Sequence, residues 1–350
     1  MKMKKHVTIL LVSILMFSLI AGCITADSTS GIDSKTLEVD SNNLYEDSQE
    51  TTVPDNTITE IPKVYMATDI SPEGLMAVYD AMGRDLTGNV AVKISTGEPG
   101  GDNYLKPDLI KDLVQSVNGT IVECNTAYGG GRAETLMHKQ VMIDHGFAAI
   151  APTDIMDEEG EISLPVTVGE HLDEFIVGSH FENYDSWIIL SHFKGHAMGG
   201  FGGALKNVAI GISSANGKSY VHTAGVSKEV SGLWGNLAEQ DDFLESMAEA
   251  NGAFMNEVGD NVVYINVLNR LSVDCDCDSS PSEPTMADIG IMASLDPIAL
   301  DQASVDQIYA APEGQDLIER MESRNATHIL DYGAGLGLGS QEYELVNLDA

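Results

Sequence analysis

Basic residues are scarce in this chain. Its 350 residues include 18 Lys and Arg against 54 Asp and Glu, which gives a formal net charge of −36. Nucleic-acid phosphates would be repelled by such a chain, so nucleic acid is excluded as a partner. The charge also disfavours electrostatic attachment to anionic lipid. Hydrophobic residues still make up 43% of the chain, and this content excludes a wholly disordered acidic protein.

Cysteine is rare as well, with four residues at positions 23, 124, 275 and 277. If Cys23 carries a lipid, as argued below, the remaining three form an odd set that does not suit a disulfide framework. One residue separates Cys275 from Cys277, so a disulfide between them would be strained and uncommon. A metal ion, a cluster, a free thiol pair and a vicinal disulfide all stay open at this point.

The N-terminus carries the longest apolar run. Lys2, Lys4 and Lys5 precede apolar residues 7–20, and the small residues Ala21 and Gly22 come just before Cys23. This pattern is typical of a secretory signal, and the run is shorter than the about 20 apolar residues that span a bilayer. We predict a signal peptide over 1–22, a lipid on Cys23 and an extracytoplasmic protein anchored to the cell membrane. An uncleaved anchor, or a cleaved signal without lipid, is the alternative.

The segment after Cys23 is rich in Ser, Thr, Asp, Glu and Asn and shows no apolar periodicity. Such a segment cannot bury enough surface to offset the entropy of ordering. We therefore predict a flexible acidic stalk over 23–61, followed by a single α/β domain over 62–350.

From residue 63, short apolar segments alternate with longer segments typical of helices. This alternation predicts a mostly parallel sheet with helices on both faces. Ligands of such sheets bind in the loops after the carboxyl ends of the strands. The predicted strands are 63–67, 90–95, 120–124, 147–151, 187–190, 262–267, 289–293 and 343–348, and the predicted helices are 72–83, 107–117, 134–144, 241–257, 297–309 and 315–323.

Three of these loops carry residues suited to chemistry, and the loop after 120–124 is the one that contains Arg132. The loop after 187–190 leads into His192 and His196, with His222 further on, and imidazoles are common metal ligands. The loop after 262–267 leads to Cys275 and Cys277, whose thiolates suit soft metals or iron–sulfur clusters. These five residues are the candidate metal ligands, although the histidines of a mobile glycine-rich loop can also serve only as hydrogen-bonding groups.

A second group of residues suits an anionic small molecule. Glycines at 199–203 allow a ligand to approach the backbone closely, and nearby lysines suit a carboxylate or phosphate. Asp301 lies one turn into a helix that Asp296 and Pro297 begin, and there it could face a site. The candidate ligand-binding residues are Arg132, Lys194, Lys206, Asn207, Lys218 and Asp301.

Taken together, segments 191–196, 200–207, 217–218, 275–277, 288–290 and 296–301 resemble, in order and spacing, the family called domain of unknown function 362. Members of that family are often described as uncharacterised iron–sulfur centre proteins. The resemblance runs from about residue 63 to the C-terminus and implies the same core domain. It implies no reaction.

This chain departs from many members of that family in one respect. They insert a ferredoxin-like module before the Cys-x-Cys segment, whereas residues 219–270 here contain no cysteine. A ferredoxin-type 4Fe–4S cluster needs four thiolates, so a ferredoxin-type cluster pair is not supported.

Two functions of different classes remain. The first is a metal- or iron–sulfur-dependent protein with a Cys-x-Cys/His site, whose thiolates would allow redox activity. The second is a lipid-anchored protein that binds a small organic anion without metal or catalysis. No P-loop, dinucleotide fingerprint or Gly-x-Ser-x-Gly nucleophile motif is present, so the sequence assigns neither a reaction nor enzyme status.

Overall fold

The computed structural model describes residues 60–349, which belong to one compact unit, Asp55–Ala350. The predicted signal peptide, the predicted lipidation site at Cys23 and nearly all of the predicted stalk lie outside the described residues. Within residues 60–349, no helix combines the length and the apolar character needed to cross a bilayer.

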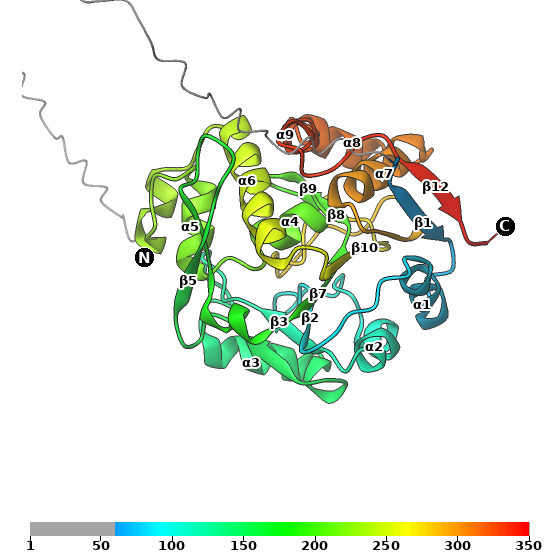
Figure 1. Ribbon diagram of the computed structural model, residues 1–350, viewed down its shortest axis with the longest axis horizontal. Coiled ribbons are helices and arrows are strands. Elements are labelled where there is room, and N and C mark those ends of the chain that lie inside the picture. Colours follow the sequence, from blue (N-terminus) through cyan, green and yellow to red (C-terminus); the bar gives the residue numbers. More distant parts are fainter. Residues whose placement is uncertain (1–59, 350) are drawn as a thin grey trace, which may run out of the picture. The chain divides into compact units, whose positions relative to one another are not determined.

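The centre of the fold is an eight-stranded sheet (Figure 1). Five strands of one half run parallel, and β1 also runs parallel to β12. β11 is antiparallel to both of its neighbours. The prediction of a mostly parallel sheet is confirmed. In order across the sheet, the strands are β12 (Glu344–Asn347), β1 (Lys63–Ala67), β11 (Gly290–Ser294), β10 (Val262–Leu268), β7 (Ser186–His192), β2 (Val90–Lys93), β3 (Thr120–Glu123) and β4 (Thr153–Ile155).

Both faces of the sheet are covered, as the sequence predicts. Successive side chains of a strand point to opposite faces, and in β7 Trp187 and Ile189 enter one core cluster while Ile188 and Leu190 enter the other. The first cluster packs against α4 (Ala204–Ala209), α6 (Gln240–Val258) and α7 (Pro297–Ala310). The second packs against α1 (Pro72–Ala81) and α2 (Pro107–Ser116).

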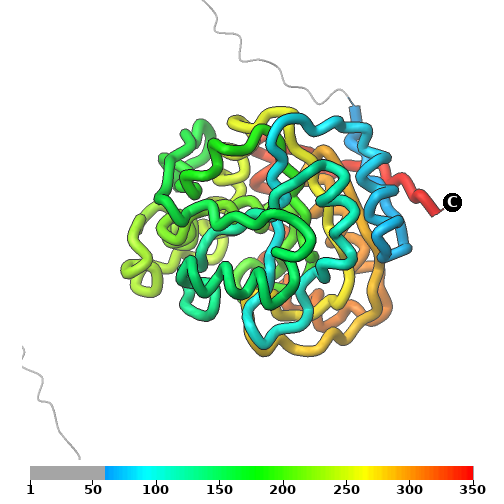
Figure 2. Tube along the Cα trace, turned by 90° about the horizontal axis from the view of Figure 1, so that it is seen from below, coloured from blue at the N-terminus to red at the C-terminus, as the bar shows by residue number. Residues whose placement is uncertain are grey.

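The two ends of the described chain meet at one edge of the sheet. β12 pairs with β1 in parallel, from Lys63 opposite Glu344 to Met66 opposite Asn347, and Figure 2 shows the red C-terminal strand beside the blue N-terminal segment. This edge is far along the sheet order from β2, β3 and β7, whose carboxyl ends carry the site.

Helix starts follow the predicted capping residues. The Ser71 hydroxyl accepts a hydrogen bond from the Gly74 amide at 3.1 Å, with Pro72 in the first turn of α1. The Asp296 carboxylate accepts one from the Ala299 amide at 2.9 Å at the start of α7. Such caps satisfy amides that have no partner inside the helix.

One predicted strand is wrong. Residues 147–151 do not form a strand, because the chain there makes a short 3-10 helix, η1 (Phe147–Ala149). Phe147 is fully buried against the α1–α2 side of the core. A short apolar run fits either a strand or a buried helical turn, and the strand that pairs with β3 is β4, a few residues later.

The glycine-rich stretch from residue 191 onward is more ordered than a loop. It forms the antiparallel pair β8 (Lys194–His196) and β9 (Gly200–Gly202), then α4 and α5 (Ala215–His222). The remaining elements are α3 (Thr135–Asp144), β5 (Glu161–Pro165), β6 (Glu174–Gly178), η2 (Ser179–Asn183), η3 (Val230–Gly235), α8 (Gln315–Glu322) and α9 (His328–Gly335).

Candidate functional site

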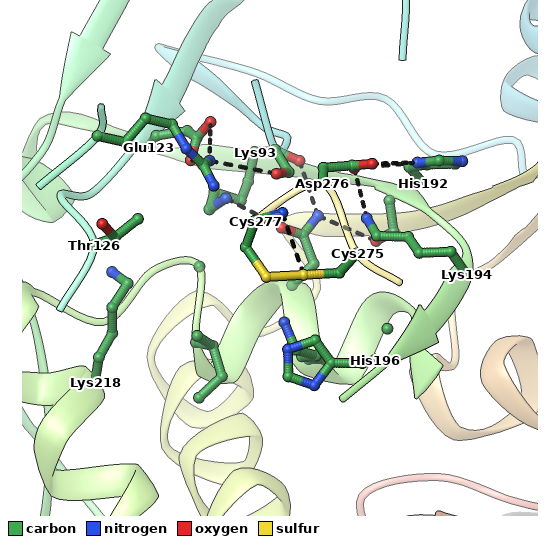
Figure 3. Close-up of a pocket in the computed structure, with 18 of the residues that line it drawn as sticks. Lys93, Glu123, Thr126, His192, Lys194, His196, Lys218, Cys275, Asp276 and Cys277 are labelled. Carbon is green, nitrogen blue, oxygen red and sulfur yellow. Dashed lines mark hydrogen bonds and ion pairs between the residues drawn. A yellow bond between two sulfur atoms is a disulfide. The ribbon is translucent and has the colours of Figure 1, made fainter. Parts of the chain in front are cut away.

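A cavity of about 80 Å³ lies at the carboxyl ends of β2, β3 and β7, where the loop after β10 closes over it. Ligands of open α/β sheets bind at this position. One water needs only about 10–15 Å³ measured this way, so the cavity is large enough for a small molecule. Figure 3 looks into it, with His196 below the Cys275–Cys277 bond and Lys194 and His192 beside Asp276.

The lining of the cavity is rich in cations although the chain is strongly acidic. Five cationic side chains line it, whereas Glu123 and Asp276 are the carboxylates among its lining residues. The cations come from separate elements, which the fold brings to one place. They are Lys93 at the end of β2, Arg132 after β3, Lys194 in β8, Lys206 in α4 and Lys218 in α5.

Arg132 is neutralised by carboxylates. Its Nε lies 2.9 Å from Glu98 Oε1 and its Nη1 lies 3.2 Å from Glu123 Oε2, with all three side chains buried. Burial opposes the charge of Arg132, but Glu123 and Glu98 outweigh it and raise the pKa of the guanidinium. Glu98 also accepts the Gly131 amide at 2.7 Å, so these ion pairs fix the glycine loop at the wall of the cavity.

Asn207 joins the strand ends to α4. Its Nδ2 donates to the carbonyl oxygens of Lys93 at 3.1 Å and Leu190 at 3.2 Å, and its Oδ1 accepts from Lys93 Nζ at 3.1 Å. Asn207 lines the cavity, but its amide is committed to these contacts, so it positions α4 and Lys93. Lys93 also donates to the Ile94 carbonyl oxygen, and burial lowers its pKa to about 8.

Lys206 differs from the other cavity lysines. Lys194 pairs with Asp276 at 2.7 Å and Lys218 donates to the Ser213 carbonyl oxygen at 2.5 Å. Among the hydrogen bonds and ion pairs of residues 60–349, none involves the Lys206 ammonium. Burial, and then the charges of Lys194 and Lys93, lower the pKa of Lys206 to about 7.

Asp276 anchors the Cys-Asp-Cys segment from its centre. Its carboxylate lies 3.0 Å from His192 Nδ1 and 2.7 Å from Lys194 Nζ. Burial would raise the pKa of Asp276, but His192 and Lys194 together hold it far below its usual range.

The same contacts remove His192 from the candidate metal ligands. Its Nε2 lies 2.7 Å from the Asn269 carbonyl oxygen, and its Nδ1 faces the Asp276 carboxylate. Both ring nitrogens are therefore engaged with oxygen atoms of the protein, and neither is left free for a metal ion.

Cys275 and Cys277 form a disulfide, with their Cα atoms 5.2 Å apart. The sequence left this uncommon pairing open beside a metal ion, a cluster and free thiols, and the structure has the disulfide, with a Cα separation inside the usual range of about 4.4–6.8 Å. The turn also places the Cys277 amide 3.2 Å from Cys275 Sγ. The remaining cysteine of the described chain, Cys124, is a buried free thiol that contacts the Ile212 carbonyl oxygen.

His196 lies against this disulfide. One of its ring nitrogens and both cysteine sulfurs lie within 4.8 Å of one another. Its Nδ1 accepts the Gly199 amide at 2.8 Å and the Met198 amide at 3.2 Å. Burial, and then the charge of Lys206, hold the pKa of His196 well below its usual value. The neutral ring therefore carries its proton on Nε2, the nitrogen left for the cavity.

Two predicted site residues do not line the cavity. His222 Nδ1 donates to the Lys218 carbonyl oxygen at 2.7 Å, so its Nε2 accepts from the Tyr128 hydroxyl at 3.2 Å. Asp301 accepts the Ala204 amide at 2.8 Å and the Leu205 amide at 3.0 Å. His222 thus holds a wall residue, and Asp301 holds the start of α4 instead of a ligand.

Sequence reasoning missed Lys93, Glu123 and Tyr128. Lys93 and Glu123 are the last residues of β2 and β3, and both are almost completely buried. A single charged residue at the end of an otherwise apolar parallel strand is the signal that could have identified them. Tyr128 carries no such signal, because its role depends on contact with His222.

The comparisons with known proteins place the chain in a family without assigning an activity. No curated protein matches it. The structure of the lactate racemase apoprotein from Thermoanaerobacterium thermosaccharolyticum is similar with a TM-score of 0.38 and 13% sequence identity, over 58% of this chain and 50% of that one. Residues 90–306, more than half of the chain, match the family described as "Domain of unknown function (DUF362)". The protein therefore belongs to the DUF362 family.

Proposed function

We propose that this protein binds a small organic anion in the cationic cavity. The observation that carries the proposal is Lys206, a lysine that lines the cavity and has no counter-ion among residues 60–349. Lys206 is half-buried, and a cation that is partly removed from water without a partner costs free energy, which a bound anion would return. Lys93 and Lys218 add further donors, because each ammonium has three hydrogens.

We also propose that the protein works outside the cytoplasm, anchored by a lipid on Cys23. The cationic start, the short apolar run and the small residues before Cys23 support this location. Growth with a radioactive or clickable fatty acid should label the full chain and leave a Cys23→Ser variant unlabelled. Equal labelling of both chains would remove Cys23 as the lipidation site.

A metal centre at His196, Cys275 and Cys277 is the second candidate. The single observation in its favour is that one donor atom of each residue lies within 4.8 Å of the others. Two thiolates and an imidazole would leave one position open on a tetrahedral metal such as zinc, where a bound metal supplies Lewis-acid chemistry. The cysteines of residues 60–349 do not complete a ferredoxin-type 4Fe–4S site, because such a cluster needs four thiolates and this part of the chain has three cysteines, Cys124, Cys275 and Cys277.

Two features rank the metal centre below anion binding. The disulfide must first be reduced, since thiolates and not cystine sulfurs bind metals. His196 must also give up the proton on Nε2 or release the amides that Nδ1 accepts. The cationic cavity, in contrast, needs no change before it takes an anion.

Anion binding is tested by calorimetry on the domain from residue 60, with pyruvate, oxalate, succinate and inorganic phosphate as probes. Binding of at least one probe is expected, with a large loss of affinity in Lys206→Met. Lys111→Met, at an exposed position of α2, is the matched control and should bind as the unchanged protein does. Absence of binding for all probes, with the domain folded, would refute the proposal.

The metal candidate is tested by elemental analysis of protein purified under reducing, oxygen-free conditions. A Cys275→Ser, Cys277→Ser double variant is the control. Stoichiometric metal that disappears in the double variant would establish the centre, whereas equal and negligible metal in both proteins would dismiss it.

A further inference from the structure

Lys206 has a property that anion binding alone does not use. It is an amine inside the cavity that is not engaged as a hydrogen-bond donor within residues 60–349, and it projects from the first turns of α4. Lysines become nucleophiles when burial or a neighbouring cation keeps them unprotonated. Lys206 meets both conditions in part, since its side chain is half-buried and Lys194 and Lys93 are nearby.

We propose that Lys206 is a nucleophilic amine that forms an imine with a 2-oxo acid bound in the cavity. The inference rests on the proposed function and narrows it to one class of anion. The Lys206 nitrogen forms a bond to the keto carbon, and the carbonyl π electrons move to the oxygen, which takes a proton from the amine. The nitrogen then gives its second proton to the same oxygen, the C–O bond breaks to release water, and the nitrogen lone pair forms the C=N bond, so the step needs no co-reactant.

The other cavity cations suit the carboxylate of such an acid. Lys93 is fixed by Ile94 and Asn207, and Lys218 is fixed by Ser213. Each keeps at least one ammonium hydrogen for a ligand. Their bonds to oxygen atoms fix them as donors that orient a ligand, whereas Lys206 has no such bond among residues 60–349 and, at a pKa of about 7, has a substantial neutral fraction at neutral pH.

Position distinguishes Lys206 from Lys194. The Lys194 ammonium is engaged in an ion pair with the Asp276 carboxylate at 2.7 Å, whereas Lys206 has no such partner among residues 60–349. Asp301 holds the first turn of α4, and Asn207, the residue after Lys206, bonds to the end of β2. The backbone that presents Lys206 is therefore fixed against the sheet.

The test is reductive trapping with pyruvate and cyanoborohydride on the domain from residue 60, followed by peptide mass spectrometry. We expect one reduced pyruvyl group on Lys206. Lys206→Arg should keep the positive charge and bind pyruvate in calorimetry, yet show no label above the level without pyruvate. Lys111→Arg is the matched control and should be labelled as the unchanged protein is.

The outcomes separate the two proposals. Pyruvate binding without label, or label on another lysine in place of Lys206, would overturn the imine and leave anion binding intact. If none of the probe anions binds, anion binding fails and the imine fails with it. Circular dichroism on each variant shows that a lost label does not come from unfolding.

Discussion

The Lys194 ammonium donates a 2.7 Å hydrogen bond to Asp276, the residue between the two cysteines of the disulfide. β8, which carries Lys194, follows β7, whereas Asp276 follows β10, the next strand in the sheet. The contact therefore fastens the disulfide loop to the neighbouring strand connection. It also accounts for the position of both sulfurs at the cavity, because the residue between them is pulled into the protein.

Replacing Asp276 by Asn should destabilise the fold by about 3 kcal/mol, because removal of one partner of a buried ion pair leaves buried charge without compensation. His192 and Lys194 would both lose their carboxylate. Chemical denaturation measures the change in the free energy of unfolding. Asp278→Asn, at an exposed position of the same loop, is the control and should change that free energy by about 0.5 kcal/mol or less. Equal effects of both substitutions would contradict the anchoring role.

Anion affinity should increase as pH falls. The pKa values of Lys206 and Lys93 in the free protein are about 7 and about 8. A bound anion stabilises the charged forms and raises both pKa values, so binding takes up protons above about pH 7. Affinity should be greatest below pH 7 and fall about tenfold per pH unit for each proton taken up as the pH rises further.

Calorimetry in two buffers of different ionisation enthalpy measures this proton uptake directly. The Lys206→Arg variant should take up fewer protons at pH 8, because arginine remains charged. An affinity that stays constant from pH 6 to pH 9 would show that neither lysine meets the ligand.

Thiol titration should distinguish the three cysteines of the domain from residue 60. Native protein should react slowly, because Cys124 is buried and burial raises its pKa above the usual range. Denatured but unreduced protein should expose Cys124 alone, and prior reduction should add Cys275 and Cys277. Three reactive thiols without reductant would mean that the pair is not a disulfide, which would favour the metal candidate.

Asp301→Asn should weaken both the fold and the site. The Asp301 carboxylate accepts the Ala204 and Leu205 amides and Asn266 Nδ2, and an amide side chain cannot accept from all three. Unsatisfied buried groups cost about 1–3 kcal/mol each. Because α4 carries Lys206, anion affinity should fall as well. Asp306→Asn, exposed on the same helix, should leave both the stability and the affinity nearly unchanged.

The sheet and its long helices could be predicted because their signals are local. Strands such as β10 are apolar apart from one residue, Asn266, and Ser71-Pro72 and Asp296-Pro297 mark helix starts by the hydrogen bonds of Ser71 and Asp296. The position of the site also followed from a general rule on parallel sheets. Five of the six candidate ligand-binding residues line the cavity, with Asp301 as the exception.

The roles of individual site residues could not be predicted because they depend on distant partners. His192 is committed by Asp276 and Asn269, and Asp301 by the start of α4, contacts that no spacing reveals. α4 spans only six residues and follows a glycine-rich segment, so tertiary packing, not helix propensity, decides that it forms. The disulfide likewise depends on the turn that the Asp276 anchor imposes.

The cationic lining and the net charge of −36 act on a ligand over different distances. A diffusing anion is repelled by the protein as a whole and attracted only when it reaches the buried lysines. The Debye length falls from about 10 Å at 0.1 M salt to about 3 Å at 1 M. Added salt therefore screens the long-range repulsion by the net charge before it screens the short-range attraction by the cavity lysines. Association should therefore become faster as ionic strength rises, the reverse of steering between opposite charges. Saline surroundings would suit a protein that captures anions in this way.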